Sequence, residues 1–218
     1  MAQLPLDLAH RPALGRDDFL VAPANEEAVA WLDRWPQWPA PALVLAGPAG
    51  SGKTHLAQVF AARSGAVVLA PKALAVARLP ELLGSAPAAI VEDGAAAPEV
   101  ALLHLYNLLA ECGGHLLLPA REPPARWGIA LADLRSRLLA APIAALQPPD
   151  DMLLAAILVK LFADRQLAVG AEVLAYLVPR LERSFEAAVR IVAALDRAAL
   201  AAHRPVTVPL AREVLAAL

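Results

Sequence analysis

Cysteine is nearly absent from this chain. Cys112 is the one cysteine in the sequence, so no disulfide can form within the chain. A chain without disulfides is typical of a reducing compartment, and the cytoplasm is therefore the expected location. The histidines have no ligand-like spacing with Cys112, and a zinc site is not expected.

Long apolar runs are also missing, although 59% of the residues are hydrophobic. Much of this excess is alanine, a small residue that favours helix. Proline, glycine or charged residues interrupt each apolar run before it reaches the ~18–20 residues that a membrane-spanning helix needs. The first residues, "MAQLPLDLAHRP", do not pair a basic segment with an apolar one. Neither an export signal nor a membrane partner is therefore expected.

Positive charge is not in excess. The chain has 19 Lys and Arg residues against 21 Asp and Glu residues, for a formal net charge of −2. A chain of this charge has no global attraction to a nucleic-acid backbone. A stand-alone DNA-binding function is therefore disfavoured, and any access to DNA is expected to be indirect.

Short apolar runs of strand length alternate with helix-like stretches. The runs are apolar on both faces, which indicates a parallel sheet covered by helices on both sides. An additional helix is expected after Asn25 as its N-cap, with Glu26 and Glu27 in its first turn. The expected strands are 42–47, 66–70, 88–93, 115–120 and 142–146, with helices at 52–64, 97–112 and 129–140 between them.

The strand signals stop after "QPPDD", and only helical patterns follow. These patterns cover residues 150–165, 171–181, 184–202 and 208–217. We therefore place a domain boundary near residue 148. The sequence predicts an N-terminal arm at 1–17, an α/β domain at 18–148 and a small all-α lid at 149–218.

"GPAGSGKTHL" matches the phosphate-loop pattern G-x-x-x-x-G-K-[ST] at Gly47, Gly52, Lys53 and Thr54. Glycines let the backbone N–H groups of such a loop point at phosphates, and the helix that follows adds its positive end. The lysine reaches the β and γ phosphates, and the threonine hydroxyl ligates Mg²⁺. An apolar strand precedes the loop and a helical pattern follows it, so nucleotide binding is predicted.

Acidic residues are expected at the end of a neighbouring strand, where they hold Mg²⁺ and orient water. "AAIVEDG" offers Glu92 and Asp93 at the tip of an apolar run. Glu92 is the candidate metal ligand beside Thr54, and Asp93 the candidate catalytic acid. The alternative is an ordinary solvated strand end.

"GKTH", followed at this distance by "LRSRL" and "QPPD", is a more specific combination than a phosphate loop alone. With "FLVAPANEEAV" and "HLLLPAREPP" it resembles the AAA+ module of the bacterial replication initiator DnaA. It resembles still more closely the Hda family of short DnaA homologues, which promote inactivation of DnaA. The resemblance implies a P-loop AAA+ α/β module with a parallel sheet covered by helices, followed by a helical lid. The sequence does not continue into the initiator's helix-turn-helix domain, so a regulator is expected.

The resemblance assigns the nucleotide contacts to two segments. Residues 19–22 would lie beside the adenine, with Leu20 and Val21 contacting it through the backbone. ADP or ATP with Mg²⁺ is the implied cofactor. The residues implied around the phosphates are Gly47, Pro48, Ala49, Gly50, Ser51, Gly52, Lys53, Thr54 and His55.

Arg137, in "DLRSRLL", falls on the arginine finger of the family, a residue that reaches a nucleotide held by a neighbouring subunit. Its catalytic role is implied by the resemblance. Judged from the residues alone, a solvated arginine near the end of a helix would be the simpler interpretation. Arg135, two residues earlier, is expected to be structural or solvated.

Three positions depart from the family pattern. Glu92 replaces an aspartate, and Ala120 stands at the sensor 1 position, where it has no polar group to offer a γ-phosphate. The sensor 2 arginine aligns near Glu186, with Arg190 one helical turn later as an alternative. A site with these changes should hold a nucleotide better than it hydrolyses one. We therefore expect ADP as a structural ligand and weak or no intrinsic ATPase activity.

"QLPLDL", at residues 3–8, resembles the Q-L-x-L-x-L peptide with which Hda-like proteins bind the replication sliding clamp (its beta subunit). The Gln3 amide would enter a polar pocket while Leu4, Leu6 and Leu8 supply apolar anchors. The alternative is a disordered start whose leucines pack loosely on the body.

Two hypotheses from different classes follow. In the first, the chain docks on a DNA-loaded clamp and stimulates hydrolysis of DnaA-bound ATP in trans. Its partners are then the clamp and DnaA, and it reaches DNA only through the clamp. In the second, it is a DnaA-related adaptor or loader scaffold that binds partners without stimulating hydrolysis. A metabolic P-loop kinase is disfavoured because the lid shows no acceptor-substrate site. A homodimer stays open.

Overall fold

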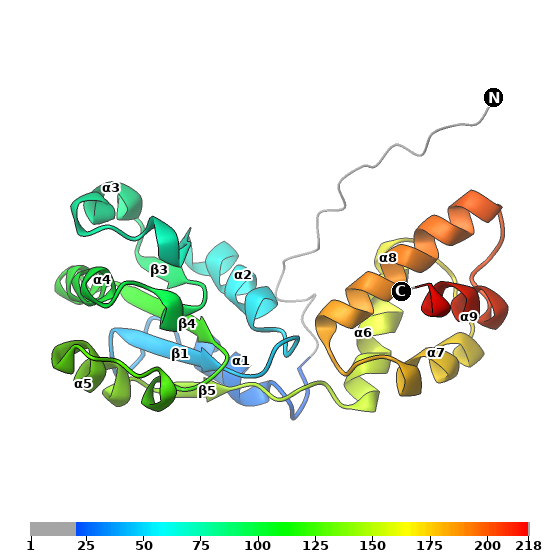
Figure 1. Cartoon of the computed structure of the whole chain (residues 1–218), viewed down its shortest axis with the longest axis horizontal. Helices are drawn as coiled ribbons and strands as arrows, with labels where there is room; N and C mark the ends of the chain where they lie inside the picture. The colour runs from blue at the N-terminus through cyan, green and yellow to red at the C-terminus, as the bar shows by residue number, and fades with distance from the viewer. Residues whose placement is uncertain (1–20, 218) are drawn as a thin grey trace.

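The computed structural model describes residues 21–217, which form an α/β part beside a group of helices (Figure 1). Within these residues, five parallel strands form one sheet in the order β2-β3-β4-β1-β5. The strands are β1 (Ala42–Ala46), β2 (Val67–Leu69), β3 (Ala88–Val91), β4 (His115–Ala120) and β5 (Ile143–Ala145). The predicted fold class, an α/β module with a parallel sheet and a helical lid, is confirmed.

β1 lies inside the sheet and pairs with β4 on one side and β5 on the other. All of its residues are buried, because helices cover both faces of the sheet. At its carboxyl end, the Gly47 N–H donates to the Ala120 carbonyl (3.1 Å), and the Leu146 N–H donates to the Ala46 carbonyl (2.7 Å). The ends of three strands are therefore fixed where the phosphate loop begins.

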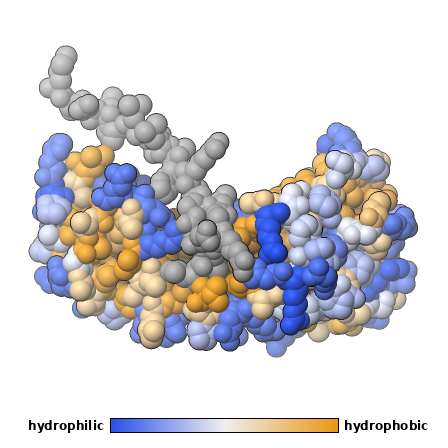
Figure 2. Space-filling view, turned by 180° about the vertical axis from the view of Figure 1, so that it is seen from behind, coloured by the Kyte–Doolittle hydropathy of each residue, from blue (hydrophilic) through white to orange (hydrophobic). Residues whose placement is uncertain are grey.

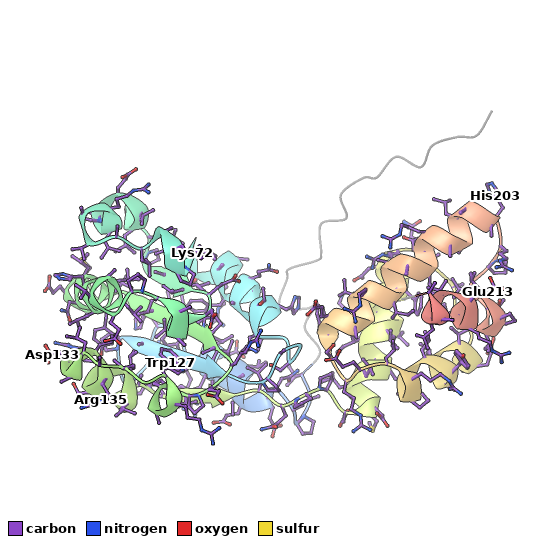
Figure 3. The ribbon with its side chains drawn as sticks, viewed as in Figure 1. Lys72, Trp127, Asp133, Arg135, His203 and Glu213 are labelled. Atoms are coloured by element: carbon purple, nitrogen blue, oxygen red, sulfur yellow. The ribbon has the colours of Figure 1, made fainter. Side chains whose placement is uncertain are left out.

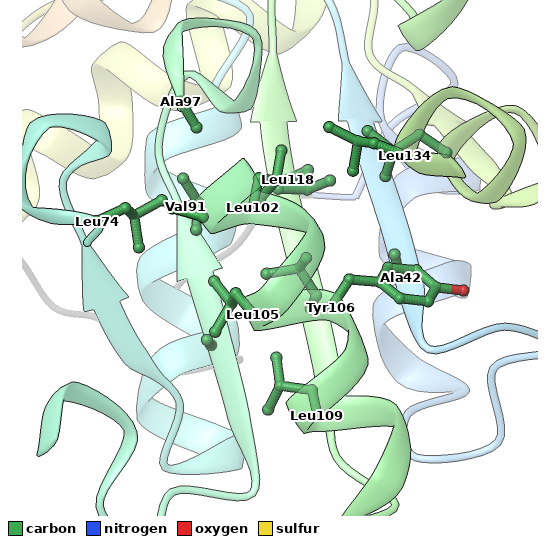
Figure 4. Close-up of a cluster of buried hydrophobic side chains, with 14 of the residues drawn as sticks. Ala42, Leu74, Val91, Ala97, Leu102, Leu105, Tyr106, Leu109, Leu118 and Leu134 are labelled. Carbon is green, nitrogen blue, oxygen red and sulfur yellow. The ribbon is translucent and has the colours of Figure 1, made fainter. Parts of the chain in front are cut away.

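Alternate strand residues point to opposite faces, so each face has its own apolar cluster. On one face, α1 (Glu26–Asp33) and α2 (Lys53–Ser64) pack on a cluster that includes Leu43 and Leu45. On the other, α4 (Glu99–Glu111) and α5 (Ala132–Ala140) pack on a cluster that includes Val44. Figure 4 shows Leu102, Leu105 and Tyr106 extending from α4 into this second cluster. The phosphate-loop helix and α5 thus belong to opposite layers.

The C-terminal helices enclose a third apolar cluster, with the side chains of Leu158, Ile191 and Leu195 fully buried. Two helices have side-chain N-caps: Asp150 accepts from the Leu153 N–H (2.7 Å), and Ser184 accepts from the Ala187 N–H (3.0 Å). The helices are α6 (Asp151–Asp164), α7 (Ala171–Leu177), α8 (Phe185–Ala202) and α9 (Val208–Ala216). The expected domain boundary near 148 falls between β5 and α6, and the division at that residue stays a prediction.

Three details differ from the sequence expectations. Asn25 occupies the N-cap position of α1 without a side-chain capping bond, and its Oδ1 accepts from the Ala22 N–H instead (2.9 Å). α5 begins at Ala132 and not at 129, because residues just before it are held by Glu99. α7 ends at Leu177, where a 3₁₀ turn containing Pro179 takes over.

The structure also contains a short helix, α3 (Leu79–Leu83), that the sequence did not predict. Its length gives little periodicity to detect, although Pro80 in its first turn is a helix-start signal.

None of the helices described in residues 21–217 is long and apolar enough to span a membrane. Seen from behind, the surface mixes hydrophilic and hydrophobic residues over both parts of the molecule (Figure 2). Met152 at the start of α6 is the most exposed of the large hydrophobic side chains described, at 83%.

Candidate nucleotide-binding site

The phosphate loop joins the end of β1 to the first residue of α2, Lys53. Gly50 and Gly52 have φ values of 71° and 96°, a region that side chains other than glycine rarely adopt. A Cβ at Gly47 would lie 2.6 Å from the Leu146 carbonyl oxygen, and one at Gly50 would collide with the Cβ of Ser184. The glycines are thus required both by backbone conformation and by close neighbours.

Lys53 is held inside the loop. Its Nζ donates to the carbonyls of Gly47 (2.7 Å) and Pro48 (2.6 Å) and lies 3.4 Å from the Ser51 hydroxyl. Burial lowers the pKa of Lys53, and the positive charge of Arg121, which follows β4, lowers it further. Two cationic side chains therefore lie near one another at the carboxyl edge of the sheet, where an anionic ligand would relieve their repulsion.

The lid touches the loop at the start of α8. The Phe185 N–H donates to the Gly50 carbonyl (2.9 Å). The ring of Phe185 stacks on His55, with centroids 5.0 Å apart and planes inclined by 21°. These contacts join Phe185 of the lid to the middle of the phosphate loop and to the first turn of α2.

A cavity of about 420 Å³ lies between α2 and the start of α8, a volume within the usual range for small-molecule sites. Its lining combines the phosphate loop with one face of the lid helix. The lining residues are Gly50, Gly52, Lys53, Thr54, His55, Gln58, Phe185, Glu186 and Val189.

The structure thus brings five of the predicted phosphate-site residues to one cavity and adds three that the sequence reading missed. Gln58 lies one helical turn after Thr54, and Phe185 and Val189 are one turn apart on α8. The i, i+4 spacing of these pairs could be recognised in the sequence. The sequence did not indicate that these two helix faces lie on the same cavity. Glu186, aligned with the sensor 2 arginine, also faces the cavity, whereas its alternative Arg190 is not among the lining residues.

Other residues predicted to contact the nucleotide are not among those that line this cavity. Gly47, Pro48, Ala49 and Ser51 belong to the same loop. Val21 is 60% exposed, and Leu20 lies outside the described residues. The nucleotide contacts assigned to these residues stay predictions.

The two acidic residues follow β3, which β4 separates from β1. Glu92 is half-buried, and Asp93 is exposed with a left-handed φ of 52°. Neither lines the cavity. Ala120, the last residue of β4, is buried and pairs with Ala46. The Mg²⁺ and catalytic roles of the acids stay predictions.

The candidate arginine finger lies on α5, at the end of the molecule away from the lid helices (Figure 1). Arg137 is half-buried in the last turn of α5, and its Cζ lies 5.3 Å from the centre of the Tyr106 ring on α4. Arg135, on the same helix, is exposed at the end of the molecule away from the lid (Figure 3).

Glu99 makes a second connection between α4 and α5. Its carboxylate accepts from the N–H groups of Ala130 (3.0 Å) and Leu131 (2.7 Å) just before α5 begins. These two hydrogen bonds, the one from Ala130 first, hold the pKa of the Glu99 carboxyl below its ordinary value of 4.5. α5 is therefore fixed on α4 at both ends.

The clamp-binding peptide predicted at Gln3, Leu4, Leu6 and Leu8 lies outside the described residues.

Comparison with known families identifies the lid. Residues 151–215 match the family model described as "Hda, lid domain". Over these residues the chain is similar to the lid of the Hda family. The matched residues run from the first residue of α6 into α9, so they include the lid helices that enclose the third apolar cluster.

Solved structures resemble this chain over most of its length. Domain III of the Thermotoga maritima initiator DnaA matches with a TM-score of 0.77 at 18% identity, covering 95% of this chain and 98% of that one. AMPPCP-bound DnaA from Aquifex aeolicus gives 0.67 at 18% identity, covering 88% and 66%. The Thermotoga maritima RuvB Holliday junction branch migration motor gives 0.67 at 17%, covering 82% and 62%. At these identities the likeness establishes the AAA+ fold.

Proposed function

We propose that this Hda-like chain regulates replication initiation by stimulating hydrolysis of DnaA-bound ATP in trans. The observation that carries the proposal is the position of Arg137 on α5, in the layer opposite the phosphate-loop helix. Its guanidinium rests against Tyr106 and is not directed at the chain's own cavity. An arginine so placed is available to a nucleotide on a neighbouring molecule.

The proposed chemistry is that of an arginine finger. Negative charge is redistributed over the transferred phosphoryl group in the transition state, and a guanidinium from a neighbour stabilises it. In comparable systems such a finger increases the rate by about 10³–10⁵. Arg137 would supply this charge, while DnaA supplies the nucleotide and the attacking water.

The chain's own nucleotide, which we propose to be ADP or ATP with Mg²⁺, has a structural role in this scheme. The residues present fit such a group, because a glycine loop, Lys53 and Thr54 open onto one cavity. Bound there, the nucleotide would contact both the loop and the start of α8 and so favour the lid position. Thr54 and Glu92 would hold the metal ion, which neutralises part of the phosphate charge.

The sequence at residues 3–8 supplies the proposed route to DNA. A glutamine and three leucines on a short peptide suit docking on a preformed surface of the sliding clamp. Docking would concentrate the chain at DNA that carries a clamp, although its net charge of −2 gives no attraction of its own.

The test is hydrolysis of DnaA-bound ATP in the presence of clamp-loaded DNA. The wild-type chain should stimulate hydrolysis, and Arg137→Ala should reduce it to the level without the chain. Arg135→Ala is the matched control, because it removes an exposed arginine from the same helix and should retain stimulation. Stimulation that survives in Arg137→Ala would contradict the mechanism. No stimulation by the wild type, with clamp and DnaA binding intact, would favour the adaptor function.

A further inference from the structure

An acidic side chain faces the phosphate loop across the cavity. Glu186 lies in the first turn of α8 and lines the same cavity as Lys53 and Thr54. It is placed there by the neighbouring lid residue, since the Phe185 N–H is bonded to the Gly50 carbonyl and its ring stacks on His55. The lid therefore brings an acidic residue to the lining of the cavity that also contains the phosphate loop.

Nearby arginines of the lid do not neutralise this carboxylate. Arg183, three residues earlier, forms an ion pair with Asp151 at 3.0 Å. Arg190, one turn later, is not among the cavity-lining residues, and within residues 21–217 no ion pair joins it to Glu186. The carboxylate is thus a local negative charge at this site.

We infer that Glu186 selects a nucleoside diphosphate over a triphosphate, an inference that rests on the proposed nucleotide binding. Each added phosphate brings negative charge toward the cavity, and repulsion from a nearby carboxylate increases with that charge and with proximity. Lys53 and the loop attract the phosphates that both ligands share. The penalty from Glu186 therefore falls mainly on the additional, terminal phosphate.

The test measures Kd for ADP and for a non-hydrolysable ATP analogue, with Mg²⁺, by calorimetry. The wild type should bind ADP more tightly. Glu186→Gln keeps the size of the side chain and removes its charge, so the ratio of Kd for the triphosphate to Kd for the diphosphate should fall about tenfold. Glu186→Arg should lower this ratio further. Because Glu186 is exposed, both variants should fold, which their unfolding curves will check.

Glu182→Gln is the matched control, since Glu182 is an exposed lid glutamate that does not line the cavity, and its ratio should equal that of the wild type. An unchanged ratio in Glu186→Gln would overturn the inference and leave nucleotide binding intact. A selective loss of triphosphate affinity, as expected if Glu186 held the metal ion, would overturn it in the same way. If the wild type binds neither nucleotide, the proposed nucleotide binding and the inference both fail.

Discussion

The guanidinium of Arg137 lies over the ring of Tyr106, with its Cζ 5.3 Å from the ring centre. Tyr106 is only 6% exposed and belongs to the apolar cluster between α4 and the sheet. The candidate finger is therefore oriented by a side chain that is itself fixed by the core. Such cation–π contacts contribute about 0.5–2 kcal/mol, depending on how far they are desolvated.

Removing the aromatic ring of Tyr106 should leave the guanidinium of Arg137 without the surface that orients it. We expect Tyr106→Leu to lower the stimulation of DnaA ATP hydrolysis at saturating chain concentration, because Arg137 loses the surface that orients it. Tyr106→Phe retains the ring and should restore stimulation. Both variants change a buried position, so their free energies of unfolding should be measured by denaturant titration, with a cost of about 1–2 kcal/mol expected for Leu. Equal stimulation by Leu and Phe variants would show that the ring does not orient Arg137.

Gly50 and Gly65 form a matched pair for testing the lid contact. Both have φ of 71°, but a Cβ on Gly50 would collide with Ser184, whereas a Cβ on Gly65 would meet no atom within 4 Å. Each Gly→Ala change should cost about 1 kcal/mol of stability through backbone strain. Gly50→Ala should additionally displace the start of α8 and weaken nucleotide binding. Calorimetry should therefore find normal affinity for Gly65→Ala, and equal loss in both would refute a lid-specific effect.

Glu99 should make stability depend on pH. Its pKa is lowered in the folded state by hydrogen bonds from Ala130 and Leu131, so the folded state binds fewer protons than the unfolded state. The stabilisation is fully present above the ordinary pKa of 4.5 and is lost as pH falls through the lower folded value. Melting curves from about pH 7 to about pH 3 should show the wild type and Glu99→Gln converging as the pH falls.

Glu111→Gln, at the other end of α4, is the control for this prediction, since it removes a carboxylate without removing these hydrogen bonds. A constant difference in melting temperature between wild type and Glu99→Gln over the whole pH range would contradict the assignment.

The predicted clamp peptide can be tested apart from the fold. Gln3→Ala should abolish capture of the sliding clamp in a pull-down, because the amide is the polar contact of the motif. Its unfolding curve should match that of the wild type. Gln37→Ala, which changes an exposed glutamine after α1, should bind the clamp normally. Clamp binding by Gln3→Ala at wild-type strength would remove this peptide from the mechanism.

Local sequence patterns predicted the sheet, the lid helices and the phosphate loop because each depends on nearby residues. Short apolar runs predicted the five strands, and the spacing of Gly47, Gly52, Lys53 and Thr54 predicted the loop. The predicted N-cap position of Asn25 is correct, but its side chain accepts from the Ala22 N–H and makes no capping bond. The predicted start of α5 was wrong, because Glu99, which is distant in sequence, holds the residues before this helix.

The sequence by itself determined the chemistry available to this protein: a phosphate loop, an arginine in "LRSRL" and a helical lid of the Hda type. Tertiary structure alone decided which residues meet. It brought Phe185 and Glu186 of the lid to Gly50 and His55, and it separated Arg137 from that cavity by placing α5 in the opposite layer. The physical reason is that helix and strand periodicity are local, whereas the pairing of faces follows from burying apolar surface between segments distant in the chain.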